Sequence, residues 1–150
     1  MDRAALLSAL LAVAACGGAQ PDFETALGAP VFLNGHDDFL TVQQANEMEA
    51  WLVESIPLAG YDAHRARACV ASAVVRVVGE GYRCWGDRPC AGEQRGELLI
   101  VVDTGCAYTS AYIHELAHWL QQCVKDRYDP SHLEQAVWSL VRSYPKRCDR

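Results

Sequence analysis

Apolar residues recur at helical spacing in two stretches of this chain and run together in two others. Residues 110–125 and 130–144 have the helical spacing, which predicts two amphipathic helices. The density of valines within residues 70–78 favours a strand, although residues 66–75 are also compatible with a helix. The apolar run within residues 97–103 predicts a buried strand. This order of strands and helices predicts a small α+β domain.

Two short patterns mark where helices begin. Thr41, with Gln44 three residues later, has the capping-box pattern that starts a helix over residues 42–55. Asp129 followed by Pro130 has the pattern of an N-cap and a first helical residue, which predicts that the last helix starts at Pro130.

The composition bounds both the fold and the partners. A chain of 150 residues with 51% hydrophobic and 21% charged residues is typical of one globular domain. The net charge of −6 and the lack of clustered lysine and arginine argue against a nucleic-acid partner or an anionic lipid surface.

The start of the chain predicts an export signal. An apolar run over residues 4–15 is too short to span a bilayer and ends in small residues. It closes on Val13-Ala14-Ala15-Cys16, which resembles the lipobox of bacterial lipoproteins. The resemblance implies that cleavage precedes Cys16 and that its thiol takes a diacylglyceryl group. A conventional signal peptide that is cleaved nearby is the alternative.

Either kind of signal takes the mature protein out of the cytoplasm. The predicted organisation is a signal peptide over residues 1–15, a lipidated cysteine with a short linker over residues 16–30, and a single domain over residues 31–150. The acyl chains would anchor the domain to a membrane of the bacterial cell envelope.

The other cysteines support an oxidising compartment. Six remain in a small exported chain, and this even number predicts three disulfides rather than free thiols or a structural zinc site. Cys84 and Cys90 bracket a turn-rich loop and can close it locally. The full set is Cys69, Cys84, Cys90, Cys106, Cys123 and Cys148.

The segment His114-Glu115-Leu116-Ala117-His118 is an H-E-x-x-H motif on a predicted helix. Two histidines four residues apart on a helix point the same way and can bind one Zn²⁺, with the glutamate within reach of a water on the metal. Both histidines project roughly 140° from the centre of the helix's apolar stripe, so they face a cleft or solvent. That stripe consists of Ile113, Leu116, Ala117, Leu120 and Val124.

A third zinc ligand has several candidates. Helical projection from Pro130 puts Glu134 about 70° from the centre of the apolar stripe and His132 about 130° away, on the solvent side. An inward-facing carboxylate is tolerated when it is paired or binds a metal, so Glu134 is the preferred ligand. The alternative ligands are His132, Asp129 and Asp126. If Glu134 binds no metal, its carboxylate is expected to pair with an arginine or to reach water.

Together these residues resemble the zincin metallopeptidases. The likeness is sharp over residues 112–122, looser over residues 97–138 and absent before them. Metzincins would continue with a glycine and a third histidine where this chain has Gln121 and Val124, whereas gluzincins take a glutamate from a following helix, as Glu134 would be. The resemblance implies a zincin-like fold with a short β-sheet, an active-site helix and a helix that carries the third ligand.

The same resemblance implies a peptidase at the cell envelope that acts on a peptide or protein substrate. Glu115 would be the general base, and a neutral donor would help zinc to stabilise the oxyanion. Residues 97–103 would form the edge strand along which an extended peptide pairs. The candidate donors are Tyr108, Tyr112, Tyr128 and His132.

The alternative function is a lipid-anchored zinc-binding or envelope-assembly module without turnover. Glu115 argues against this alternative, because a structural zinc site needs no general base and more often closes with a fourth protein ligand.

Overall fold

The computed structural model of the chain describes residues 18–106 and 110–146. Within these residues, five strands form one mixed sheet in the order β1-β2-β3-β7-β6, and two short strands form a separate hairpin. The sheet contains β1 (Phe23–Glu24), β2 (Pro30–Phe32), β3 (Val74–Val78), β6 (Gly92–Arg95) and β7 (Leu98–Val102), and the hairpin contains β4 (Arg83–Cys84) and β5 (Arg88–Pro89). The helices are α1 (Val42–Ser55), α2 (Ala63–Ser72), α3 (Ser110–Lys125) and α4 (Gln135–Ser143), with a 3₁₀ turn η1 (Ile56–Ala59). The chain is thus α+β, as expected.

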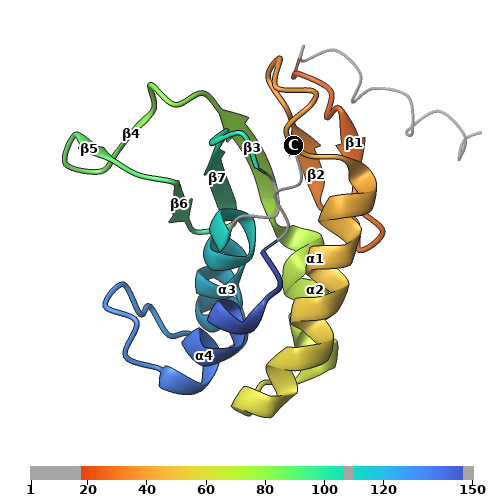
Figure 1. The fold of residues 1–150 in the computed structure, drawn as a ribbon. Coiled ribbons are helices and arrows are strands. Elements are labelled where there is room, and N and C mark those ends of the chain that lie inside the picture. The colour runs from red at the N-terminus through yellow and green to blue at the C-terminus, as the bar shows by residue number, and fades with distance from the viewer. Residues whose placement is uncertain (1–17, 107–109, 147–150) are drawn as a thin grey trace, which may run out of the picture.

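The helices lie together on one side of the sheet, with α3 against β6 and β7 (Figure 1). The apolar stripe expected for α3 is buried at all five positions. It packs in one core with Val75 and Val77 of β3 and with Leu99 and Val101 of β7, all of them buried. Burial of this stripe fixes the rotation of α3, so the face that carries the H-E-x-x-H histidines is turned away from the core.

The edge strand of the sheet beside α3 is β6, and not the strand expected from the sequence; β1 lies at the other edge. Strand β7, which lies within the predicted residues 97–103, pairs in parallel with β3 on one side and antiparallel with β6 on the other. A tight turn at Gly96 joins β6 to β7, and its φ of 58° is one that glycine adopts without steric cost. The sequence predicts β7 correctly as a buried strand, but β6 is mostly polar and has no hydrophobic pattern that would reveal it.

The capping box at Thr41 is confirmed. The Thr41 hydroxyl accepts from the backbone N–H of Gln44 at 3.2 Å, and the Gln44 side chain accepts from the backbone N–H of Thr41 at 2.9 Å. Helix α1 therefore begins where these two residues predict.

Two other boundaries differ from the sequence-based ones. Asp62 caps the start of α2, and its carboxylate accepts from the backbone N–H of Arg65 at 2.7 Å. Residues 70–72, for which the sequence favours a strand, form the end of this helix, and the strand starts only at Val74. The predicted linker over residues 16–30 contains β1 and the start of β2, which pair with each other. The folded domain therefore begins before residue 31.

Two disulfides are formed among the described residues. Cys69–Cys123 links α2 to α3, and Cys84–Cys90 closes the β4–β5 hairpin as expected. Cys106 is disulfide-bonded as well, whereas Cys148 and Cys16 lie outside the described residues, as does the predicted signal peptide. The disulfides indicate an oxidising, exported environment. Over residues 18–106 and 110–146, the helices fall short of the length and apolar character that a membrane span requires.

Candidate metal centre

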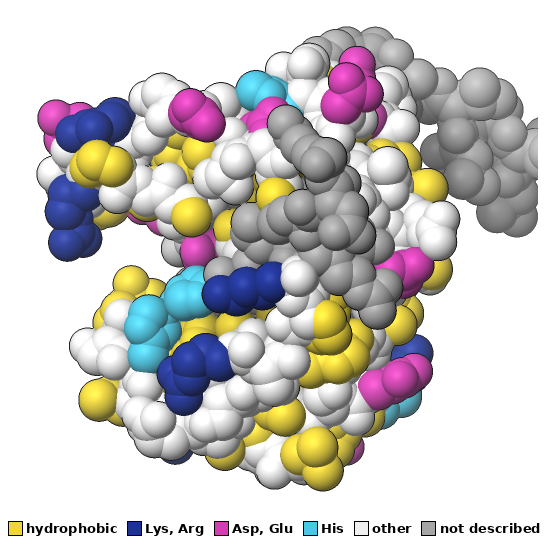
Figure 2. Space-filling view, in the orientation of Figure 1, with side chains coloured by type: hydrophobic (Ala, Val, Ile, Leu, Met, Phe, Trp, Pro, Cys, Tyr) yellow, Lys and Arg dark blue, Asp and Glu magenta, His cyan; other side chains and the backbone are white. Residues whose placement is uncertain are grey.

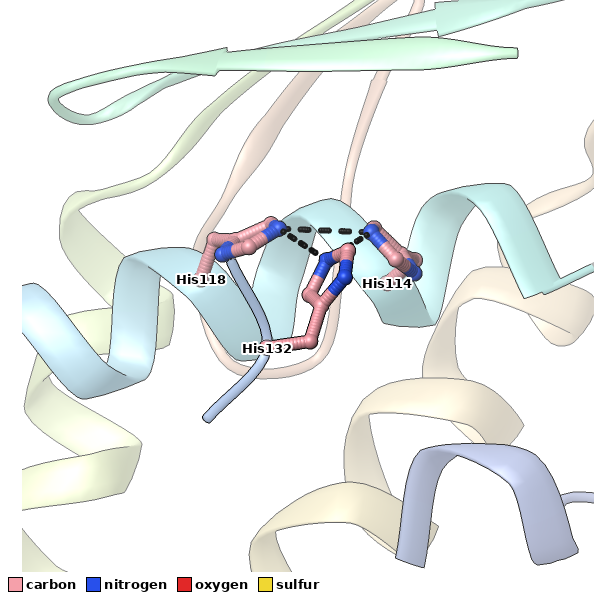
Figure 3. Close-up of side chains that lie close together, drawn as sticks. All are labelled: His114, His118 and His132. Carbon is pink, nitrogen blue, oxygen red and sulfur yellow. Dashed lines mark hydrogen bonds between the residues drawn. The ribbon is translucent and has the colours of Figure 1, made fainter. Parts of the chain in front are cut away.

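Three histidine side chains converge on one point beside α3. His114 and His118 project from the same face of that helix, and His132 approaches from the segment between α3 and α4 (Figure 3). Their Nε2 atoms are separated by 3.2 Å (His114 to His118), 3.1 Å (His114 to His132) and 3.2 Å (His118 to His132). Within the described residues, this is a group of three potential ligand atoms that can hold a metal ion.

The geometry of the three nitrogens suits zinc. A tetrahedral ion with Zn–N bonds of about 2.0–2.1 Å separates its ligand nitrogens by about 3.3 Å, close to the spacing of these Nε2 atoms. Burial and the neighbouring imidazoles lower the pKa of His114 and of His118 to about 4. Both rings are consequently neutral at pH 7, with a lone pair free for a metal.

The indole of Trp138 lies against all three imidazoles. Its ring centroid is 4.9 Å from that of His114, 4.6 Å from that of His118 and 4.3 Å from that of His132. Trp138 is 2% exposed and comes from α4. The core side of the histidine group is therefore closed by one rigid aromatic ring, which limits the rotation of the three imidazoles.

His132 reaches this group because the chain does not become helical at Pro130. The Asp129 carboxylate accepts from the backbone N–H groups of Leu133 at 2.8 Å and Glu134 at 2.9 Å, and from Trp138 Nε1 at 2.9 Å. Although burial opposes ionisation, the hydrogen bonds from Trp138 and these two N–H groups hold the pKa of Asp129 well below its usual value. The turn so formed has His132 at φ 56°, and α4 begins only at Gln135.

Glu134 lies outside the histidine group. Its carboxylate accepts from the Tyr61 hydroxyl at 2.6 Å and from Gln121 Nε2 at 3.0 Å, and it forms ion pairs with Lys125 and Arg127. The sequence-based choice of Glu134 as third ligand assumed a helix from Pro130, whereas the helix begins only at Gln135. The structure brings His132, and not Glu134, beside His114 and His118, and Asp129 supports the turn that carries His132.

Glu115 is buried beside the edge strand. Only 6% of its surface is exposed, and burial together with the charge of Glu93 raises its pKa to about 8. A Cβ atom at position 92 would lie 2.8 Å from Glu115 Cγ and 2.9 Å from Oε1, so Gly92 in β6 is the residue that leaves room for this carboxylate. Sequence reasoning missed Gly92, Trp138 and the part played by Asp129, because each acts through contacts between distant elements.

The histidines and Glu115 line one cleft of about 590 Å³. One wall is formed by β6 and the β4–β5 hairpin, and the other by α3 and the segment that leads to His132. Figure 2 shows the molecule hollowed at this position, with histidine side chains (cyan) along one border. Glu115 and the imidazoles are therefore open to a ligand from the same side.

The four candidate oxyanion donors lie in different places. Tyr108 is outside the described residues, and the Tyr112 hydroxyl is buried and donates to Glu49 at 2.6 Å. His132 belongs to the histidine group, whereas Tyr128 lines the cleft and is 69% exposed. Tyr128 is thus the described candidate whose hydroxyl is available to a bound ligand.

The chain was also compared with known proteins, and it matches no family model, no curated protein and no solved structure.

We predict that zinc binding depends on His132 and not on Glu134. His132→Ala removes one of the three proposed ligand atoms. Loss of a residue that only hydrogen-bonds to a ligand typically lowers metal affinity by roughly 10–100-fold, so the affinity of this variant for added zinc should fall by more than that. Glu134→Gln should retain zinc, and His64→Ala on α2 serves as a control. Titration with a chromophoric zinc chelator measures all three; zinc loss in the Glu134 variant with retention in the His132 variant would reverse the assignment.

The metal-free protein should lose stability as the pH rises from about 6.5 to 8. Because the pKa of Glu115 is raised to about 8, the folded state keeps a proton in this range that the unfolded state has released, and stability falls as that proton leaves. The two histidines act in the opposite direction, because the pKa of His114 and of His118 is lowered to about 4 in the folded state, whereas an unfolded imidazole with its ordinary pKa of about 6.5 still holds part of a proton at pH 6.5. Stability rises as the unfolded imidazoles release that proton, which offsets part of the fall due to Glu115.

Urea unfolding of the metal-free protein at the two pH values measures this effect. The free energy of unfolding should fall by about 1 kcal/mol in the wild type, and in Glu115→Gln this fall should be replaced by a slight rise. An equal fall in both proteins would mean that Glu115 is not buried as a neutral acid.

Proposed function

We propose that this protein is a zinc-dependent metallopeptidase with a zincin-like site. His114, His118 and His132 are the proposed zinc ligands, and Glu115 is the proposed general base. The observation that carries the proposal is the position of Glu115, which is buried one residue from a ligand and opens into the same cleft as the three imidazoles. A structural zinc site needs no such carboxylate.

Each residue has a definite task in peptide hydrolysis. A bound zinc ion would supply Lewis-acid chemistry that polarises the scissile carbonyl and makes water nucleophilic near neutral pH. An imidazole that binds an ion carries no negative charge, so three histidine ligands would leave the full charge of the zinc available, and a site with only three protein ligands would leave a position for water. The positive charge of a bound zinc ion would favour the ionised form of Glu115, which would then accept the proton of the attacking water and later donate it to the leaving amine.

The substrate in this proposal is an extended peptide that adds to the edge of the sheet. Strand β6 pairs with β7 on one side only and borders the cleft, so a peptide can hydrogen-bond along its other side. The position of Gly92 in β6 would bring that peptide next to Glu115. Tyr128, which borders the cleft, is the proposed neutral donor to the oxyanion.

Replacing Glu115 separates a peptidase from a zinc-binding module without turnover. Glu115→Gln should keep zinc, because no ligand is lost, while turnover of a quenched fluorescent peptide pool should fall by about 10²–10⁴-fold. The control is Glu54→Gln on α1. Wild-type protein that binds zinc but cleaves no peptide would favour the envelope module, and unchanged cleavage by Glu115→Gln would exclude Glu115 as the base.

We further propose that the protein is exported and anchored to a membrane through Cys16. The disulfides support export, and the pattern Val13-Ala14-Ala15-Cys16 supports lipidation of Cys16. Cys16→Ala should leave unprocessed precursor or release soluble protein, because the diacylglyceryl acceptor is lost. Membrane fractionation checks this prediction. A variant that fractionates like the wild type would contradict lipidation at this residue.

A further inference from the structure

The β4–β5 hairpin holds an uncovered indole at the cleft. Trp85 is 80% exposed and lines the same cleft as the three histidines and Glu115. Large aromatic side chains contribute most when they are buried, and an exposed one beside a ligand cleft is a ready contact for an apolar group. Its neighbours on this wall include the Cys84–Cys90 disulfide and Pro89, which are also weakly polar.

The hairpin that carries Trp85 is held in place from β6. The backbone N–H of Trp85 donates to Glu93 Oε1 at 3.1 Å, and the Tyr82 hydroxyl donates to Glu93 Oε2 at 2.8 Å. Arg95 forms an ion pair with the same Glu93 oxygen at 2.8 Å, which offsets its charge. The backbone at Trp85 is thus held by a disulfide and a hydrogen bond before any ligand arrives, so little loop entropy is lost on binding.

From this arrangement, we propose that Trp85 determines specificity by stacking on an aromatic or large apolar side chain of the bound peptide. The inference rests on the proposed function, since it assigns a substrate class to that cleft. Two parts of the cleft support this proposal. Strand β6 can hold the peptide backbone, and the β4–β5 hairpin, which is bonded to Glu93 of β6, presents the Trp85 ring beside that strand. The neighbouring Arg88 also lines the cleft, and it would favour an acidic side chain instead.

The test uses the zinc-loaded full-length protein and N-acetyl dipeptide hydroxamates, whose hydroxamate chelates zinc independently of turnover. Probes carry Ala at both positions, or Phe or Glu at one of them, and calorimetry gives each dissociation constant. A Phe probe should bind about tenfold more tightly than the Ala probe. Trp85→Ala should abolish this preference, and Trp85→Phe should keep most of it.

The matched control is Leu58→Ala, since Leu58 is 82% exposed on η1 and does not line the cleft. It should leave the Phe preference unchanged. Binding of the Ala probe without a Phe preference, or a preference that survives in Trp85→Ala, would overturn the role of Trp85 while leaving the zinc site intact. A Glu preference that Arg88→Ala removes would also overturn it, in favour of acidic substrates. Failure of every probe to bind the zinc-loaded protein would instead overturn the proposed function itself.

Discussion

The histidine group depends on one buried carboxylate. Asp129 accepts hydrogen bonds from two successive backbone N–H groups, from the Trp138 indole and from Gln121 Nε2. The backbone N–H groups just before a helix lack partners within the helix, and Asp129 accepts from two of them. These hydrogen bonds hold the chain in a turn that precedes α4. His132 lies in that turn with a positive φ, and the indole of Trp138 packs against its imidazole. The hydrogen bonds to Asp129 therefore position His132, as helix α3 positions His114 and His118.

The rest of the site follows from how α3 packs. Burial of its apolar stripe against β3 and β7 leaves the opposite face for His114 and His118, and it brings Glu115 against β6. The edge strand has to carry glycine at position 92 because the carboxylate occupies the space of a side chain. The Cys69–Cys123 disulfide ties α2 to α3 and adds a covalent restraint to this packing. The orientation of α3 thus positions both His114 and His118 and the proposed base, Glu115.

Much of this arrangement can be predicted from the sequence where the pattern is local. The H-E-x-x-H spacing, the stripe that starts at Ile113 and the capping box at Thr41 all depend on residues within one helix. The position of His132 cannot be predicted in that way, since Asp129-Pro130 resembles an ordinary helix start and only the hydrogen bonds of Asp129 to Trp138 and Gln121 show otherwise. Strand β6 is likewise hidden, because an edge strand of polar residues carries no hydrophobic alternation.

A crystal structure of the zinc-loaded protein, with anomalous scattering recorded at the zinc edge, tests the central claim most directly. We expect one peak about 2.0–2.1 Å from Nε2 of His114, His118 and His132, with a fourth position held by solvent or an added ligand and facing Glu115. A peak coordinated by Glu134, or a fourth position closed by another protein side chain, would contradict it.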